Sequence, residues 1–166
     1  TIDKFVGDAI LIFFGDPETK GDEEDAHSCV LMALEMQERM HHLKNLWDGE
    51  GITNPLEIRI GINTGYCNVG NFGSENRLDY TIIGGEVNLA SRLESNAMTG
   101  QILISQETYA LIKKHIVCEK KDEIKVKGIA HKIQTYQVVG SYKNIAQKRK
   151  ILKEKFDGFN LNIDLN

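Results

Sequence analysis

Two polar side chains that could act on one ligand stand in the stretch DYTIIGGEVNLASRLES, residues 79–95. Asn88 and Arg92 are four residues apart in a segment of small and aliphatic residues that reads as a helix, just after Gly84 and Gly85. Positions i and i+4 share one face of a helix, so the amide and the guanidinium would project from the same side. An amide offers hydrogen bonds and a guanidinium binds phosphate oxygens, so this face suits a polar, anionic ligand.

Three further charged residues stand where an ordinary structural role is also available. Asp8 lies in a tight turn between two predicted strands, where an acid is usually a turn former. Lys4 belongs to the first of these strands, and Arg59 lies between Ile58 and Ile60 on a later one. Taken alone, Lys4 is more typical of a solvated strand face, and Arg59 fits a surface role on an amphipathic strand as well. Taken singly, none of the three indicates a function.

The composition bounds the kind of protein that can carry these residues. A chain of 166 residues, 41% hydrophobic and 27% charged, is typical of one globular domain with a single core. The net charge of -4 argues against a nucleic-acid partner. Three cysteines without metal-binding spacing favour reduced thiols in the cytosol. No apolar run is long enough to cross a bilayer, so either the protein is soluble or its membrane part lies outside this chain.

The hydrophobic pattern predicts the elements that position the candidate residues. Strands are expected at residues 2–6, 9–14, 56–62, in the segment up to 73, and at 77–83, 101–105, 123–128 and 132–140, and helices at 23 to about 47, from 84 or 85 onward, and at 106–114. The predicted fold class is α+β, with a mostly antiparallel sheet and helices packed on it.

The tail changes character after Gly140. Residues 141–156 resemble a basic helix, and residues 159–166 alternate apolar and polar side chains like a strand. We therefore divide the chain into a domain at 1–140 and a C-terminal helix and strand at 141–166. The tail can either return to the sheet or lead into a following domain, and its spacing fits both.

Taken together, the motifs resemble the catalytic domain of the class III nucleotidyl cyclases. The ordered set is K-x-x-x-D, R-I-G-I-N-T-G, Y-T-I-I-G-x-x-V-N-L-A-S-R and V-K-G, and it extends from the first residue to about Gly140. The resemblance implies a ferredoxin-like or palm-like fold. It also implies that the chain opens inside a hairpin and lacks a preceding strand and helices that carry a further metal-binding Asp, so the fragment alone is expected to be folded but poorly active.

The resemblance also implies how phosphates and metals are bound. Asp8 matches the family residue that holds two Mg²⁺ (or Mn²⁺) ions together with the second Asp, and hard oxygen ligands suit these ions. Arg59 and Lys127 match two triphosphate contacts. Asn88 matches the residue that orients the ribose, and Arg92 the residue that meets the α-phosphate. Catalysis would then rest on positioning and electrostatic stabilisation.

Lys4 and Thr81 match the positions with which the family reads the purine edge. Adenine offers an acceptor at N1 and a donor at its amino group, which fit a lysine donor and a threonine acceptor. Guanine presents the reverse pattern, and guanylyl members carry Glu and Cys-type residues there. The resemblance therefore implies an adenylate cyclase that converts ATP to 3',5'-cyclic AMP and pyrophosphate for cyclic nucleotide signalling.

Assembly follows from the way the family divides its site. Asp8 and Arg59 lie on one subunit of such an enzyme, and the base, ribose and α-phosphate contacts face them from the other. This chain carries both halves, so the expected partners are ATP and a second copy in a homodimer with shared sites. The expected location is cytoplasmic. This expectation is compatible with an upstream sensor or membrane domain in the parent protein.

Three alternatives stand beside this interpretation, two of them from other functional classes. The segment GGE at residues 84–86 is similar to the diguanylate cyclase signature, but here a helix follows it instead of a hairpin. A non-catalytic cyclase homology domain, acting as a dimerisation or nucleotide-binding module, would typically have lost Asp8, Asn88 or Arg92, and all three are present. A guanylate cyclase would carry Glu and Cys-type residues at the positions of Lys4 and Thr81.

Overall fold

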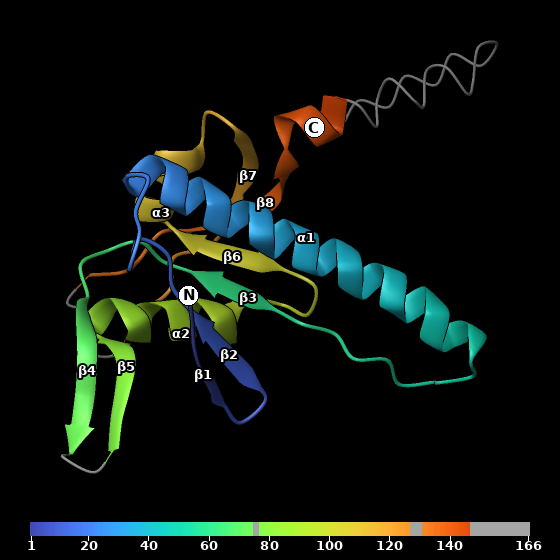
Figure 1. The fold of residues 1–166 in the computed structure, drawn as a ribbon. Coiled ribbons are helices and arrows are strands. Elements are labelled where there is room, and N and C mark those ends of the chain that lie inside the picture. The colour runs from blue at the N-terminus through green and yellow to red at the C-terminus, as the bar shows by residue number, and fades with distance from the viewer. Residues whose placement is uncertain (75–76, 127–130, 147–166) are drawn as a thin grey trace.

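The computed structural model describes residues 1–74, 77–126 and 131–146. Its strands and helices alternate irregularly along the chain (Figure 1). They are β1 (Ile2–Val6), β2 (Ala9–Ile12), α1 (Asp22–Gly49), β3 (Ile60–Ile62), β4 (Asn68–Ser74), β5 (Arg77–Ile83), α2 (Gly85–Asn96), β6 (Ile102–Ser105), α3 (Gln106–Ile112), β7 (Ile116–Lys120) and β8 (Thr135–Ser141). No helix in these ranges is long and apolar enough to cross a membrane.

A four-stranded sheet in the order β3-β6-β8-β7 forms the centre of the domain. Strand β3 pairs with β6 in parallel, whereas β8 is antiparallel to both β6 and β7. Two separate antiparallel hairpins, β1-β2 and β4-β5, complete the strands, and β4-β5 projects away from the sheet (Figure 1). The predicted α+β class with mostly antiparallel pairing is confirmed.

Helices cover both faces of this sheet, giving three layers (Figure 1). Successive side chains of a strand point to opposite faces, and β6 is buried along its whole length. Ile102 and Ile104 therefore pack with α1 and α3, while Leu103 packs with Leu89 and Leu93 of α2. The continuous apolar run in β6 is the pattern expected of a strand buried on two sides. The buried Leu89 and Leu93 hold α2 against the sheet, and the opposite face of the helix is exposed to solvent.

Gly61 sets the distance between β3 and α2. A Cβ atom at this position would lie 2.7 Å from Glu94 Cα, and closer still to Glu94 N and Ala90 O. These are backbone atoms of the helix, so they cannot move aside as a flexible side chain could. The backbone of α2 thus rests directly on β3, and the glycine of the R-I-G-I-N-T-G motif permits it.

Gly61→Ala is expected to lower the free energy of unfolding by about 3 kcal/mol, because the added methyl forces α2 away from the sheet. Urea unfolding of the purified domain, followed by circular dichroism, measures this change. Gly49→Ala in α1 is the matched control, since a Cβ there meets nothing within 4 Å. Equal destabilisation by both variants would contradict the close packing of α2 on β3.

The predicted strands differ most from the structure at three places. Strand β7 was not predicted, and it pairs with β8 over Ile116–Lys120. Within the predicted strand 123–128, the described residues form only an isolated bridge between Ile124 and Ile133, and residues 127–128 lie outside the described ranges. The predicted strand 56–62 begins only at Ile60, and Leu56 is exposed. Among the described residues, those before Ile60 have no partner strand. Strand β6 pairs only with Ile60–Ile62, and Ile58 O accepts a single backbone hydrogen bond from Gly100 N, just before β6.

The predicted tail falls largely outside the described residues. Strand β8 continues one residue past the predicted boundary at Gly140, to Ser141, and a helical turn follows at residues 142–146. The remaining predicted helix and the alternating segment 159–166 are not described. The division into 1–140 and 141–166 therefore stays a prediction.

Candidate functional site

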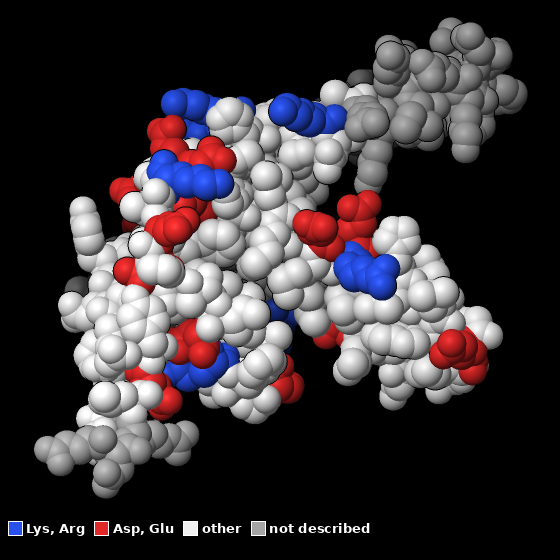
Figure 2. Space-filling view, in the orientation of Figure 1, with Lys and Arg blue, Asp and Glu red and all other residues white. Residues whose placement is uncertain are grey.

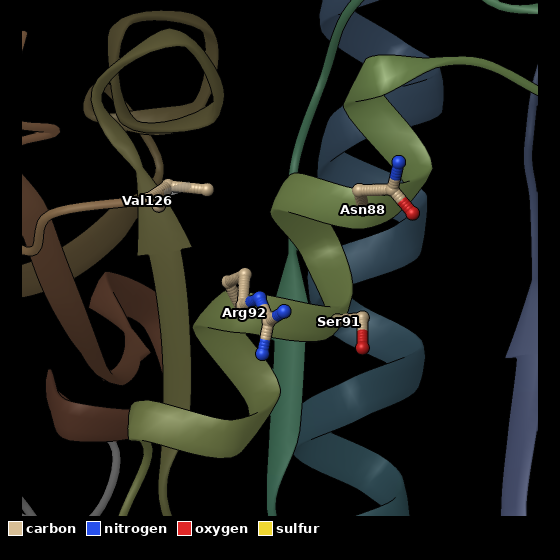
Figure 3. Close-up of a pocket in the computed structure, with 4 residues that line it drawn as sticks. All are labelled: Asn88, Ser91, Arg92 and Val126. Carbon is tan, nitrogen blue, oxygen red and sulfur yellow. The ribbon is translucent and has the colours of Figure 1, made fainter. Parts of the chain in front are cut away.

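A surface pocket of about 330 Å³ lies beside the exposed face of α2. Its lining residues are Asn88, Ser91 and Arg92 from the helix and Val126 from the segment after β7 (Figure 3). Asn88 and Arg92 are both exposed, while Leu89 and Leu93 anchor the opposite side of the helix in the core. The predicted juxtaposition of an amide and a guanidinium on one face of α2 is therefore present, and Figure 3 shows both beside the pocket.

The loop after β3 holds the first turn of α2 in place. Asn63 Nδ2 donates to the backbone oxygen of Glu86 at 3.2 Å and to its carboxylate at 2.7 Å. Gly65 lets this carboxylate approach, because a Cβ there would lie 2.6 Å from Glu86 Cγ. Asn63 and Glu86 are positioning residues that the sequence analysis did not single out. The signal was available in the N-T-G segment, whose polar and small residues do not suit a strand interior.

Lys4 and Thr81, predicted to read a base, are brought together by a residue that was not predicted. The Thr81 hydroxyl donates to Asp3 Oδ2 at 2.7 Å, and Lys4 Nζ lies 3.7 Å from Asp3 Oδ1. The Asp3 side chain is 1% exposed and that of Lys4 is 45% exposed. Strand β1 therefore lies against β5 through a buried acid between two candidate recognition residues.

Asp8 lies exposed at the tip of the β1-β2 hairpin. Gly7 before it has a φ of 64°, as the first position of a type II′ turn requires. Its carboxylate is a hard oxygen donor, and Mg²⁺ is commonly bound by one or two carboxylates together with substrate phosphates. Within the described residues no group of three or more His, Cys, Asp or Glu could hold a metal by itself. Asp8 thus fits as one ligand of a metal that a nucleotide brings with it.

Arg59 contacts α2 on a different side from the pocket. Its Nε donates to Glu94 Oε1 at 2.5 Å, and its side chain is 47% exposed. Neither Arg59 nor Asp8 lines the pocket of Asn88 and Arg92. Lys127 follows directly on Val126 of the pocket wall in the sequence, but it lies outside the described residues. The roles of all these side chains stay predictions.

The thiols and the charge pattern limit other chemistries. Burial raises the pKa of both Cys29 and Cys118 to about 11. The pKa of Cys67 is also raised, mainly by burial and to a lesser extent by the negative charge of Glu86. These thiols are protonated at neutral pH, which disfavours a cysteine nucleophile. Figure 2 shows cationic and anionic side chains interspersed on the visible face, over the part of the chain that is described. This face therefore has mixed charge, and the absence of a nucleic-acid partner stays a prediction.

Comparison with known proteins gives consistent similarities. Residues 3–140 match the family model described as adenylate and guanylate cyclase catalytic domain. The chain is 33% identical over 159 residues to an adenylate cyclase of Dictyostelium discoideum called terminal-differentiation specific, covering 93% of this chain and 7% of that protein. The crystal structure of the adenylyl cyclase CyaB from P. aeruginosa superposes with a TM-score of 0.82 at 59% identity, covering 86% of this chain and 73% of that one. The structure of the guanylyl cyclase Cya2 gives 0.77 at 38% identity, with 85% and 70% covered.

Proposed function

The chain belongs to the family of adenylate and guanylate cyclase catalytic domains, and we propose that it is the catalytic part of an adenylate cyclase, which converts ATP to 3',5'-cyclic AMP and pyrophosphate in cyclic nucleotide signalling. The observation that carries the choice of ATP is the pairing of Lys4 with Thr81 through Asp3. The similarity to the adenylyl cyclase CyaB structure, at 59% identity, supports the same choice.

In the proposed reaction, α2 orients the nucleotide. Asn88 holds the ribose by hydrogen bonds, and Arg92, one turn later, binds the α-phosphate. The 3'-hydroxyl oxygen attacks the α-phosphorus and gives its proton to solvent. The bond from that phosphorus to the oxygen bridging to the β-phosphate breaks, and pyrophosphate leaves. The guanidinium stabilises the negative charge that grows on the phosphate oxygens in the transition state. Gly61 lets α2 rest on β3, and Asn63 binds the first turn of the helix. The helix therefore presents Asn88 and Arg92 in a fixed position.

Charge neutralisation on the triphosphate is assigned to the remaining candidates. Asp8 would hold Mg²⁺ or Mn²⁺, two ions per site in the proposal, and the bound ions supply positive charge to the phosphate oxygens. Arg59 and Lys127 would contact the triphosphate from opposite subunits. Arg59 is paired with Glu94 in the structure, so binding of the triphosphate would exchange one carboxylate partner for phosphate oxygens.

We propose that the active form is a homodimer with shared sites. Asn88 and Arg92 line one pocket that neither Asp8 nor Arg59 enters, as expected if the two groups meet across an interface. Exposed apolar side chains on both hairpins support such an interface, because soluble monomers rarely leave large apolar patches uncovered. They are Ile2, Phe5, Val6 and Ile10 on β1-β2, and Val69, Phe72, Leu78, Tyr80 and Ile83 on β4-β5. The three free cysteines fit the proposed cytoplasmic location.

The full-length protein is expected to use ATP over GTP by about 30-fold in kcat/KM, because guanine would leave buried groups unpaired against Lys4 and Thr81. Measurement of cyclic nucleotide formation from each substrate with Mg²⁺ tests this. The paired replacement Lys4→Glu with Thr81→Cys is expected to erode the preference. Comparable turnover of ATP and GTP by the unaltered protein would contradict the proposed preference for ATP. Unchanged selectivity in the double variant would show that Lys4 and Thr81 do not select the base.

A further inference from the structure

We propose that Asp3 is a positioning residue that fixes the hydrogen-bonding polarity of Lys4 and Thr81 and thereby sets the preference for the adenine base. The inference rests on the proposed function, since it assumes that these two side chains read a purine. It adds a residue that would touch no atom of the substrate. Asp3 would act through its two neighbours.

Each oxygen of the Asp3 carboxylate has a partner in the structure. Oδ2 accepts the Thr81 hydroxyl at 2.7 Å and lies 3.5 Å from the backbone N–H of Ile82, and Oδ1 lies 3.7 Å from Lys4 Nζ. The side chain is 1% exposed. A buried carboxylate is costly unless it is paired and hydrogen-bonded, so these partners stabilise it where it is. The acid is therefore part of the contact between β1 and β5.

A β-bulge places Asp3 there. Ile2 pairs with Ile12 and Lys4 pairs with Leu11, so the register shifts between them and Asp3 has no partner on β2. In a regular strand, Asp3 and Lys4 would point to opposite faces. The extra residue breaks this alternation and re-aims the side chain, so Asp3 and Lys4 can meet each other. Bulges of this kind are enriched next to active sites.

The hydrogen bond to Asp3 decides what Thr81 can offer a base. A hydroxyl carries one proton and two acceptor lone pairs, and a free hydroxyl rotates to suit either kind of partner. A carboxylate has no proton to give, so the Thr81 proton must point toward Asp3, and the oxygen is left to accept. Adenine presents an amino donor at its sixth position, whereas guanine presents an acceptor there. Asp3 thus turns an ambivalent threonine into an acceptor that matches adenine.

The same carboxylate restrains Lys4. An ammonium has three donors and no acceptor, and its long side chain is costly to immobilise. With Asp3 at 3.7 Å, the charged end of Lys4 is kept near Thr81, although 45% of its side chain is exposed. The two base-reading groups are then presented as one fixed donor and one fixed acceptor, with spacing set by the acid between them.

The test measures kcat/KM for ATP and for GTP in the full-length protein and its Asp3 variants. Asp3→Ala removes the acceptor and is expected to lower the ratio of ATP to GTP about tenfold, because Thr81 regains its freedom to donate. Asp3→Asn keeps an amide oxygen that can accept the Thr81 proton and is expected to lower the ratio only about threefold. This graded order would not arise from a general loss of folding, which thermal melting reports separately.

Asp16→Ala is the matched control. Asp16 Oδ1 accepts the hydroxyl of Tyr80, the neighbour of Thr81 on β5, so its loss also weakens the attachment of β5 without touching Thr81. This variant is expected to leave the ratio unchanged. The inference is overturned if Asp3→Ala keeps the unaltered protein's ratio, if Asp3→Asn shows no decrease, or if Asp16→Ala lowers the ratio as far as Asp3→Ala. If the unaltered protein shows no preference for ATP, the proposed function fails instead.

Discussion

Replacing Arg92 with alanine is expected to lower kcat for cyclic AMP formation by a factor of about 10² to 10³. The guanidinium would be needed most when charge grows on the α-phosphate, so its loss should appear mainly in kcat and only weakly in KM. Because Arg92 is exposed while Leu89 and Leu93 carry the packing of α2, the fold should survive the change. Initial rates at saturating ATP and Mg²⁺ in the full-length protein give both constants.

Two variants on the same helix make this prediction specific. Arg92→Lys keeps a positive charge but loses the planar fork, so an intermediate rate is expected. Ser95→Ala is the control, since Ser95 is exposed, donates to the backbone oxygen of Ser91 and does not line the pocket. It should keep the activity of the unaltered protein within about twofold. An Arg92→Ala enzyme with nearly normal kcat would remove Arg92 from the proposed mechanism.

Mixing two inactive proteins, Asp8→Ala and Arg92→Ala, is expected to restore about a quarter of the original activity. If each site takes Asp8 from one subunit and Arg92 from the other, a mixed dimer has one intact site and one site that lacks both groups. With free exchange at equal concentrations, about half of the dimers are mixed, and each supplies half of the normal sites. Cyclic AMP formation after mixing, compared with each protein alone, measures the recovery.

The complementation experiment needs evidence that subunits exchange. Different affinity tags on the two variants allow mixed dimers to be recovered and counted. Asp8→Ala proteins carrying both tags serve as the matched control, because their mixed dimers contain no intact site. No recovery in the presence of mixed Asp8→Ala and Arg92→Ala dimers would mean that each site is built within a single chain, and the shared-site proposal would be wrong.

Much of the domain follows from local sequence alone. Three features depend on residues close in sequence. They are the two-residue turn at Gly7 and Asp8, the α2 helix with its buried Leu89 and Leu93, and the helical spacing that places Asn88 and Arg92 on one face. Such short-range patterns are sufficient because helix and hairpin periodicity already specify which side chains share a face. The structure agrees with these predictions, and it places the amide and the guanidinium beside one pocket.

Tertiary structure decided the features that depend on partners distant in sequence. Strand β7 exists because β8 pairs with it, while residues 56–59 alternate just as well but have no partner strand in the described part of the chain. The role of Gly61 is visible only where the backbone of α2 rests on β3. The sequence analysis did not single out Asp3, which lies at the bulge between Ile2 and Lys4 and accepts a hydrogen bond from Thr81, 78 positions away. A register shift and a cross-strand hydrogen bond depend on which strands meet, and no local pattern encodes that meeting.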